Sequence, residues 1–159
     1  MLVLKAVGTC WVSKSLIARL VQEADDALPD ETGGALVGYW AADDVVVTQL
    51  ISGGPKAAHG RDFFEPDWEF QQAQIDCYYA RSGRLHTYLG DWHSHPSGLL
   101  RLSRRDRRTL RLIANHPDAR APNALMLLLA DDGGWEVGVW RVDRSRCFSS
   151  PIRMPLVPY

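Results

Sequence analysis

The longest apolar run of the chain, Ala124 to Ala130, is the feature that most restricts its fold. A continuous apolar segment of this length, followed by the turn residues Asp131 to Gly134, is typical of a strand that is buried on both faces. The run is far shorter than the ~20 residues that a membrane-spanning helix needs. We therefore expect a buried strand and no segment that crosses a membrane.

Capping residues and the spacing of apolar positions predict the organisation of the remaining chain. Ser13 can cap a helix whose apolar residues recur on one face, and Asp67 and Ser103 can begin two more. Residues 52–66 hold three glycines and two prolines, so we expect a loop there. The predicted helices cover 13–27, 67–81 and 103–115, and the predicted strands cover 34–40, 45–51, 85–95, 124–130, 135–142 and, as an edge or tail, 148–154. One mixed α/β domain over residues 1–159 is expected, because this length suits a single domain.

Charge and cysteine content exclude several classes of protein. The chain has 18 Lys and Arg against 19 Asp and Glu, which argues against a general nucleic-acid binder. Cys10, Cys77 and Cys147 are widely spaced and form no C-x-x-C pair, which argues against a disulfide framework and against a cysteine zinc site. Because the N-terminal residues also lack a signal-peptide pattern, we expect a cytoplasmic protein.

The segment from 91 to 106 holds residues on which a metal site can be built. His93 and His95 are two residues apart on a predicted strand and so project from the same face. A turn follows, and Asp106 lies in the first turn of the next predicted helix, which can point back at the strand. Two histidines, one aspartate and an open fourth position are the composition of a catalytic zinc site, where water becomes acidic enough to attack a carbonyl. The alternatives are surface histidines and a capping box made by Ser103 and Asp106.

A zinc hydrolase also needs a carboxylate that holds the water and carries its proton. Glu31 is the best candidate, because it closely precedes Gly33 and Gly34 at the start of a predicted strand. Glycines at this position allow the neighbouring backbone, or an extended substrate chain, to approach closely. A loop carboxylate in solvent is the alternative interpretation of Glu31.

Together these residues resemble the JAMM motif of the JAB/MPN metalloproteases, E…H-[ST]-H-P-x(6)-S-x-x-D. The chain supplies every element of this motif at the family's spacing, with Glu31, His93-Ser94-His95-Pro96 and Ser103-x-x-Asp106. The residues 90–92 and 54–67 look like the bacterial, deubiquitinase-like branch of the family. The resemblance covers essentially the whole chain and implies a three-layer α/β/α sandwich around a curved mixed sheet.

The resemblance also implies a role for each motif residue. His93, His95 and Asp106 would bind one zinc ion per chain. Glu31 would be the general acid–base, and Ser103 would donate a hydrogen bond to the developing oxyanion. The implied reaction is hydrolysis of the amide or isopeptide bond that follows the C-terminal glycine of a ubiquitin-like protein.

Two other functions stay open within this resemblance. A JAMM protease can process a ubiquitin-like sulfur-carrier protein, and a non-catalytic MPN domain can serve as a scaffold, although the intact motif argues against the scaffold. The expected partners are the ubiquitin-like or sulfur-carrier substrate and enzymes that resemble ubiquitin-activating and ubiquitin-conjugating proteins. We expect neither a nucleic acid nor a membrane as a partner.

Several residues outside the motif are candidates for lesser roles. Asp91 shares the predicted ligand face and can orient an imidazole. His59, in the predicted loop, can contact a substrate tail, with a solvated loop histidine as the alternative. The six arginines from Arg101 to Arg111 predict a solvated helix face or a contact with an acidic partner or a substrate carboxylate. The tryptophans at 40, 68, 92, 135 and 140 are expected in the core.

Overall fold

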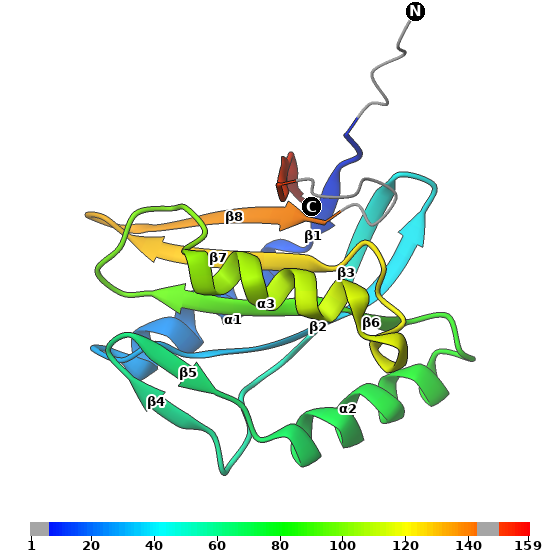
Figure 1. Ribbon diagram of the computed structural model, residues 1–159, viewed down its shortest axis with the longest axis horizontal. Coiled ribbons are helices and arrows are strands. Elements are labelled where there is room, and N and C mark those ends of the chain that lie inside the picture. The colour runs from blue at the N-terminus through cyan, green and yellow to red at the C-terminus, as the bar shows by residue number, and fades with distance from the viewer. Residues whose placement is uncertain (1–6, 143–149) are drawn as a thin grey trace, which may run out of the picture.

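The computed structural model describes residues 7–142 and 150–159 and is built on one eight-stranded sheet (Figure 1). Neighbouring strands run parallel in three pairs and antiparallel in the others, so the sheet is mixed, as expected. In order across the sheet the strands are β10 (Leu156–Pro158), β1 (Cys10–Val12), β3 (Asp44–Ile51), β2 (Gly33–Ala41), β6 (Thr87–His95), β7 (Leu125–Asp131), β8 (Trp135–Arg141) and β9 (Ile152–Met154).

The two edge strands of the sheet are consecutive in the chain. Only Pro155 separates β9 from β10, yet β9 pairs with β8 and β10 pairs with β1. Because one residue cannot cross a flat sheet of this width, the sheet must curve until its two edges approach each other. The prolines at 155 and 158 fit these edge positions, since proline cannot donate a ladder hydrogen bond.

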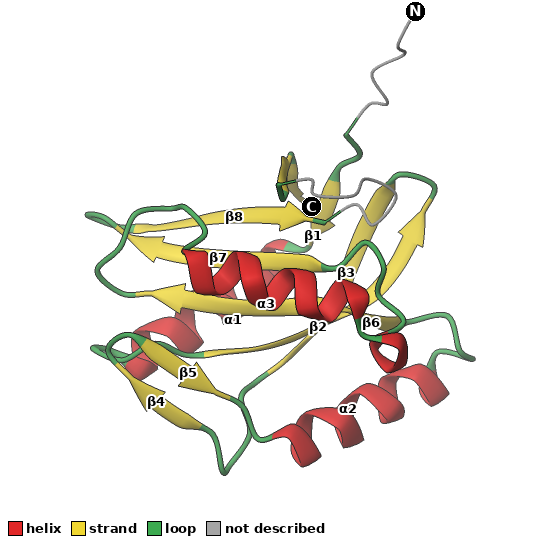
Figure 2. Cartoon of the chain, viewed as in Figure 1, coloured by secondary structure: helices red, strands yellow, loops and turns green. Residues whose placement is uncertain are grey.

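Helices cover both faces of the sheet, which confirms the expected α/β/α layers (Figure 2). One face is covered by α1 (Lys14–Ala27), and the other by α2 (Trp68–Arg81) and α3 (Arg104–Asn115). The α1 side chains of Leu20 and Ala24 lie in the larger core cluster, with apolar residues of the central strands. On the opposite face α3 buries Leu110 and Ala114, and Phe70 of α2 packs beside them on a separate cluster.

The apolar run that predicted a buried strand is β7, and every residue from 124 to 130 is buried. This strand lies between β6 and β8 in the sheet, with α1 on one face and α3 on the other. The three predicted helices are also confirmed, and their N-caps are Ser13, Asp67 and Ser103. Each of these side chains accepts a hydrogen bond from a backbone N–H three residues later. No helix of the described residues is both long and apolar enough to cross a membrane.

Trp68, which was expected in the core, and a second large apolar side chain on a helix, Leu112, are exposed. Trp68 is 64% exposed at the first position of α2, and Leu112 is 62% exposed on α3. The buried stripe of α3 is Asp106, Leu110 and Ala114, so the helical period turns Leu112 away from the sheet. Of the other tryptophans expected in the core, Trp92 is fully buried and those at 40, 135 and 140 pack partly buried against the core clusters.

The segment 52–66 is not the plain loop that its glycines and prolines predict. It contains a hairpin of two short strands, β4 (Ala58–Gly60) and β5 (Phe63–Glu65), which form a separate two-stranded sheet. Strands of three residues carry too little alternation for a sequence pattern to reveal them. The strand predicted at 85–95 begins two residues later, since Arg84 adopts a positive φ. Of the strand predicted at 148–154, only its last three residues form β9, and 148–149 lie outside the described residues.

Candidate metal centre

The orientation of β6 brings its two histidines to the face that α2 and α3 cover. The register between β6 and β2 shifts next to Gly90, whose φ is +143°. A bulge of this kind reverses the facing of the residues that follow it. Leu89 and Trp92 therefore both lie in the core on the α1 side. His93 and His95 consequently point to the other side, toward the first turn of α3.

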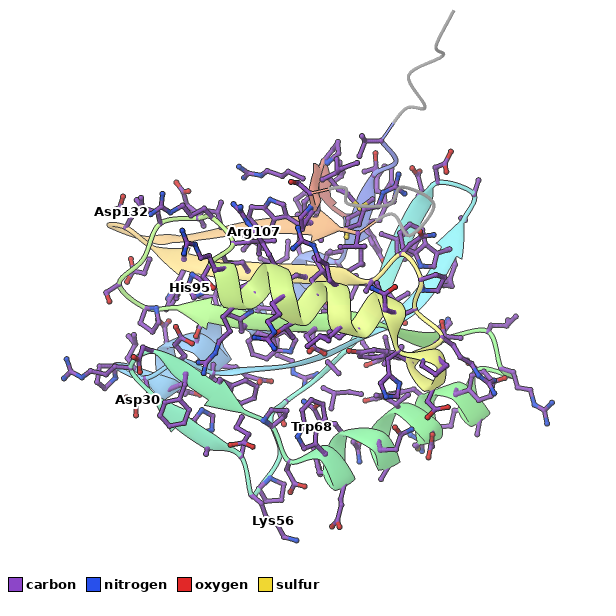
Figure 3. All side chains as sticks on the ribbon, viewed as in Figure 1. Asp30, Lys56, Trp68, His95, Arg107 and Asp132 are labelled. Atoms are coloured by element: carbon purple, nitrogen blue, oxygen red, sulfur yellow. The ribbon has the colours of Figure 1, made fainter. Side chains whose placement is uncertain are left out.

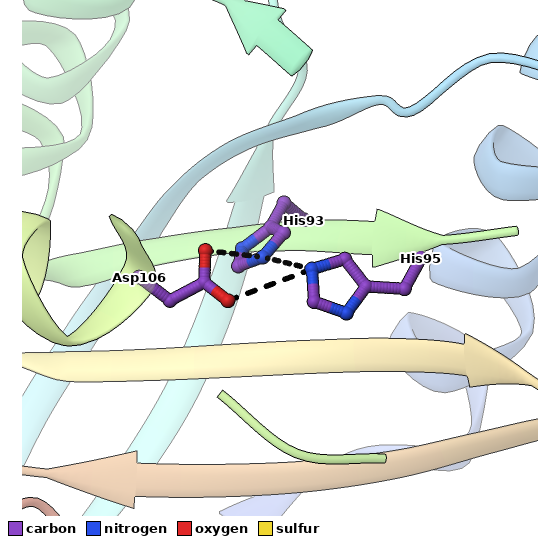
Figure 4. A group of neighbouring side chains, drawn as sticks. All are labelled: His93, His95 and Asp106. Atoms are coloured by element: carbon purple, nitrogen blue, oxygen red, sulfur yellow. Dashed lines mark hydrogen bonds and ion pairs between the residues drawn. The ribbon is translucent and has the colours of Figure 1, made fainter. Parts of the chain in front are cut away.

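His93, His95 and Asp106 converge on one point between β6 and α3 (Figure 4). The two Nε2 atoms are 3.0 Å apart, and the carboxylate oxygens of Asp106 lie 3.1 Å from Nε2 of His93 and 3.5 Å from Nε2 of His95. Two ligands at ~2.0–2.1 Å from a tetrahedral zinc ion lie about 3.4 Å apart. The donor set therefore fits zinc with little rearrangement. Neither described cysteine, Cys10 or Cys77, belongs to this group, and Cys147 lies outside the described residues.

The capping box at the start of α3 holds the Asp106 carboxylate in place. The backbone N–H of Ser103 donates to Oδ2 of Asp106 at 2.7 Å, and the Asp106 N–H donates to Oγ of Ser103 at 3.1 Å. Burial would raise the pKa of Asp106, but the His93 ring and hydrogen bonds from the backbone N–H and the side chain of Ser103 hold that pKa well below its usual range. The capping box is therefore confirmed, and it leaves the Asp106 carboxylate beside both histidine rings, as the ligand hypothesis requires.

The ring of His95 is available as a neutral ligand. Burial lowers the pKa of His95, with the His93 ring acting in the same direction, so its imidazole is uncharged at neutral pH. A hydrogen bond with the Leu99 backbone holds the ring of His95 in position. Such bonds fix the orientation of metal-ligating imidazoles.

A cavity of about 450 Å³ opens beside the three donors and contains Glu31. Burial raises the pKa of the Glu31 carboxyl to about 7, and no described residue donates a hydrogen bond to it. Ser103 is exposed and does not line this cavity, and its side chain hydrogen-bonds Asp106. The cavity is lined by the motif residues Glu31, His93 and Asp106, by Phe63 to Pro66 of the hairpin, by Trp68 and Gln71 of α2, by Arg105 and Thr109 of α3, and by Gly34, Asp91, Trp92 and Met126 of the sheet.

The hairpin fixes the backbone of Glu31. Its N–H donates to the Gly60 carbonyl at 2.8 Å, and Nδ1 of His59 lies 3.0 Å from its carbonyl oxygen. Because a carbonyl only accepts, Nδ1 of His59 carries the hydrogen. His59, predicted as a solvated loop residue or a contact to the tail, therefore also supports Glu31. No sequence pattern indicated this contact, because the hairpin itself was not predicted.

Gly33 and Gly34, which follow Glu31, make room for neighbouring parts of the protein itself. A Cβ on Gly33 would lie 2.5 Å from the Trp92 carbonyl oxygen and 2.8 Å from the Phe64 ring. A Cβ on Gly34 would collide with the Ile51 carbonyl. Close approach of the neighbouring backbone, one of the two interpretations of these glycines, is therefore confirmed, because β3, β6 and the hairpin occupy the space next to them.

Asp91 lies on the ligand face, as expected, but it does not orient an imidazole. Its carboxylate accepts a hydrogen bond from the Tyr88 hydroxyl at 2.7 Å, and none of the described hydrogen bonds joins it to His93 or His95. Burial raises the pKa of Asp91 to about 6. The sequence pattern did not indicate Tyr88, whose approach to Asp91 depends on the bulge at Gly90.

The sequence and the fold were compared with known proteins, and the matches agree with one another. The family described as prokaryotic homologs of the JAB domain matches residues 13–143. A probable metalloprotease of Sinorhizobium fredii, y4qB, is 43% identical over 75% of this chain and 74% of its own length. A CD-NTase/cGAS isopeptidase of Enterobacter hormaechei is 28% identical over 80% of this chain and 70% of its own. The solution structure of a Desulfitobacterium hafniense protein superposes with a TM-score of 0.70 over 94% of this chain and 92% of that one, at 19% identity, and so supports the fold.

Proposed function

The chain belongs to the prokaryotic JAB-domain family, and from this premise we propose that it is a zinc-dependent isopeptidase. Its relatives, named metalloprotease and isopeptidase, support a metal-dependent hydrolase. The proposed reaction is hydrolysis of the amide or isopeptide bond after the C-terminal glycine of a ubiquitin-like protein. The observation that carries the proposal is one cavity that contains a carboxylate, Glu31, next to three donor atoms at the separations of a tetrahedral ion.

The proposed metal ligands are His93, His95 and Asp106. Zinc at this position supplies Lewis acidity, which polarises the scissile carbonyl and makes water a nucleophile at neutral pH. The capping box presents the Asp106 carboxylate already ionised, and burial keeps the His95 ring neutral. These side chains therefore need little rearrangement and little change of protonation when they bind the ion.

Glu31 is the proposed general acid–base. Its carboxylate takes a proton from the attacking water and later delivers that proton to the leaving amine. The absence of a hydrogen-bond donor to this carboxylate among the described residues leaves both oxygens available for the proton. Ser103 is proposed to donate to the developing oxyanion, because it lies at the start of α3, three residues before the proposed ligand Asp106.

The hairpin supports an extended tail as the substrate. Residues Phe63 to Pro66 line the cavity, and β5 pairs on one side only, with β4. An extended peptide can add to such a free strand edge through its backbone. The exposed rings of Phe63 and Trp68 stand at the same cavity, which favours residues without side chains close to the scissile bond.

A cleavage assay tests this function. The substrates are ubiquitin-like proteins encoded beside the gene for this chain. Each is fused to a reporter, which is joined to the terminal glycine either through a peptide bond or through a lysine side chain. We expect cleavage after glycine that a chelator abolishes, and no cleavage when leucine replaces the glycine. Glu31→Gln should retain zinc and lose about 10²–10⁴-fold in rate. Cleavage of casein at many unrelated sites, or an unchanged rate for Glu31→Gln, would contradict the proposal.

A further inference from the structure

Six arginines make one exposed, basic surface, here called the arginine face. All six side chains are exposed, and none has a carboxylate within ion-pair distance among residues 7–142 and 150–159. Other surface cations do have partners, as Arg19 pairs with Glu23. The members of the arginine face are Arg101, Arg104, Arg105, Arg107, Arg108 and Arg111.

The fold does not require this surface. Arg104, Arg108 and Arg111 follow one another at i, i+4 and i+7, on the side of α3 opposite its buried stripe. Like charges at i and i+4 destabilise a helix. The capping box and the buried Leu110 hold α3 in spite of this repulsion. A basic surface that destabilises its own helix and forms no ion pair with the described residues is a candidate for binding.

The arginine face begins at the cavity. Arg105 lines the cavity together with Asp106 and Thr109, and its Nη1 atom donates to the Asp62 carbonyl in the turn of the hairpin at 3.5 Å. The other arginines belong to α3 or to the loop before it, and Figure 3 shows α3 on the face of the molecule turned to the viewer, with Arg107 labelled. A chain whose tail lies between the hairpin and Glu31 would therefore have its folded part close to these arginines.

We propose that the arginine face binds a carboxylate-rich surface on the folded part of the ubiquitin-like protein whose tail enters the cavity. This inference rests on the proposed function. Charge complementarity identifies the partner's chemistry, because guanidinium groups form paired hydrogen bonds with carboxylates. Two apolar side chains lie within the same surface, Leu99 at 55% and Leu112 at 62% exposure. Exposed leucines between cations suit a protein surface, whereas a nucleic-acid backbone offers them no partner.

Binding of this kind acts before the chemical step. Surface charges that meet a complementary partner mainly raise the association rate, and this effect weakens as salt increases. The contact is equally strong in the ground state and in the transition state, so it lowers KM and leaves kcat unchanged. The arginine face is therefore a substrate-docking surface separate from the catalytic residues.

The test uses peptides that carry the proposed feature and no other part of a partner. Each ends in Gly-Gly amide-linked to a fluorophore and begins with six glutamates, six glutamines or six lysines, followed by a flexible Gly/Ser spacer. We expect a KM about tenfold lower for the glutamate peptide than for the glutamine peptide, with equal kcat. Arg104→Glu with Arg108→Glu should remove this advantage, and Arg104→Gln with Arg108→Gln should reduce it. Arg81→Glu with Arg84→Glu, exposed residues outside the arginine face, changes the net charge equally and should preserve it.

A binding measurement separates this inference from the proposed function. Fluorescence anisotropy of the glutamate peptide with chelator-treated protein needs no hydrolysis, and binding should weaken as salt rises. Binding that both Arg→Glu pairs weaken equally would overturn the inference, as would equal KM for all three peptides. A labelled 20-mer DNA that binds the arginine face more tightly than the glutamate peptide would overturn it in favour of a nucleic acid. Circular dichroism confirms that each variant is folded.

Discussion

At the scale of single residues, Glu31 has a fixed backbone and an unpaired carboxylate. Its N–H and its carbonyl both bond to the hairpin, whereas its side chain faces the cavity without a donor among the described residues. A general acid–base needs both properties, because it must stay in reach of the substrate and must exchange its proton freely. We therefore propose that the hairpin acts in catalysis through Glu31 as well as through the proposed substrate contact.

His59→Ala is expected to lower kcat by about tenfold, because small displacements of a catalytic group reduce rates steeply. His59→Gln retains an N–H donor and should recover part of the loss. Steady-state kinetics on a Gly-Gly substrate, with zinc content measured in parallel, checks this. His116→Ala is the control, since His116 is exposed and caps only the short 3-10 helix Pro117–Ala119. A change in KM alone would show that His59 contacts the tail and does not position Glu31.

Glu31→Gln is expected to stabilise the metal-free protein at high pH only. The pKa of Glu31 is about 7 in the folded chain against an ordinary 4.5, so between these values the folded state holds a proton that the unfolded chain has lost. The free energy of unfolding therefore falls as the pH rises through this window, and stays reduced above it. Glutamine has no charge to lose, so the variant lacks this decline.

Urea denaturation of both proteins in chelator measures that difference. We expect the variant to exceed the wild type in stability at about pH 8 and to match it at about pH 4. The same difference at both pH values would show that the carboxylate is solvated in the folded protein.

At the scale of elements, local signals in the sequence predicted most of what holds the site. Capping residues marked the start of each helix, and the apolar run from 124 to 130 marked β7. The proximity of His93 and His95 to Asp106 was also predictable, because a two-residue period and a helix start are local properties. Features that depend on distant contacts were not predictable.

The hairpin and the bulge illustrate this limit. β4 and β5 pair over three residues each, and the Phe64 ring of β5 packs against Gly33 and Gly53, which are remote in the sequence. In the sequence pattern Gly90 is an ordinary glycine of a predicted strand. In the structure, however, a Cβ at this position would collide with the Leu125 carbonyl of β7. Only the assembled sheet shows why this residue lacks a side chain.

Gly90→Ala is therefore expected to destabilise the protein by several kcal/mol, since it combines a positive φ with a backbone collision. Gly133→Ala is the matched control, because its φ of +87° is also positive but nothing lies within 4 Å of the added Cβ. That control should cost only about 1–2 kcal/mol. Thermal denaturation of both variants gives the comparison, and equal losses would show that the bulge does not constrain β6.

At the scale of the whole molecule, the sheet and its two helical layers form a core that does not depend on the metal. Separate apolar clusters lie beneath α1 and beneath α2 and α3, whereas the proposed ligands sit at one end of β6 and α3. A chain of this length buries enough surface to fold without a metal ion. The metal therefore belongs to the chemistry of the site.

Removal of the metal is expected to abolish hydrolysis and to leave a folded protein with a lower Tm. The shift arises because an ion that binds only the folded state stabilises it by mass action. Circular dichroism and thermal denaturation before and after chelation, and after zinc is restored, measure both effects. Loss of cooperative unfolding on chelation would mean that the ion is structural.

The most direct test of the account is the zinc content of the purified protein, determined by native mass spectrometry. We predict one zinc ion per chain in the wild type, in Glu31→Gln and in Cys77→Ser, and none in His95→Ala or Asp106→Ala, with all five proteins folded. Zinc that persists in His95→Ala and Asp106→Ala but is lost in Cys77→Ser would contradict the assignment of His93, His95 and Asp106 as the metal centre.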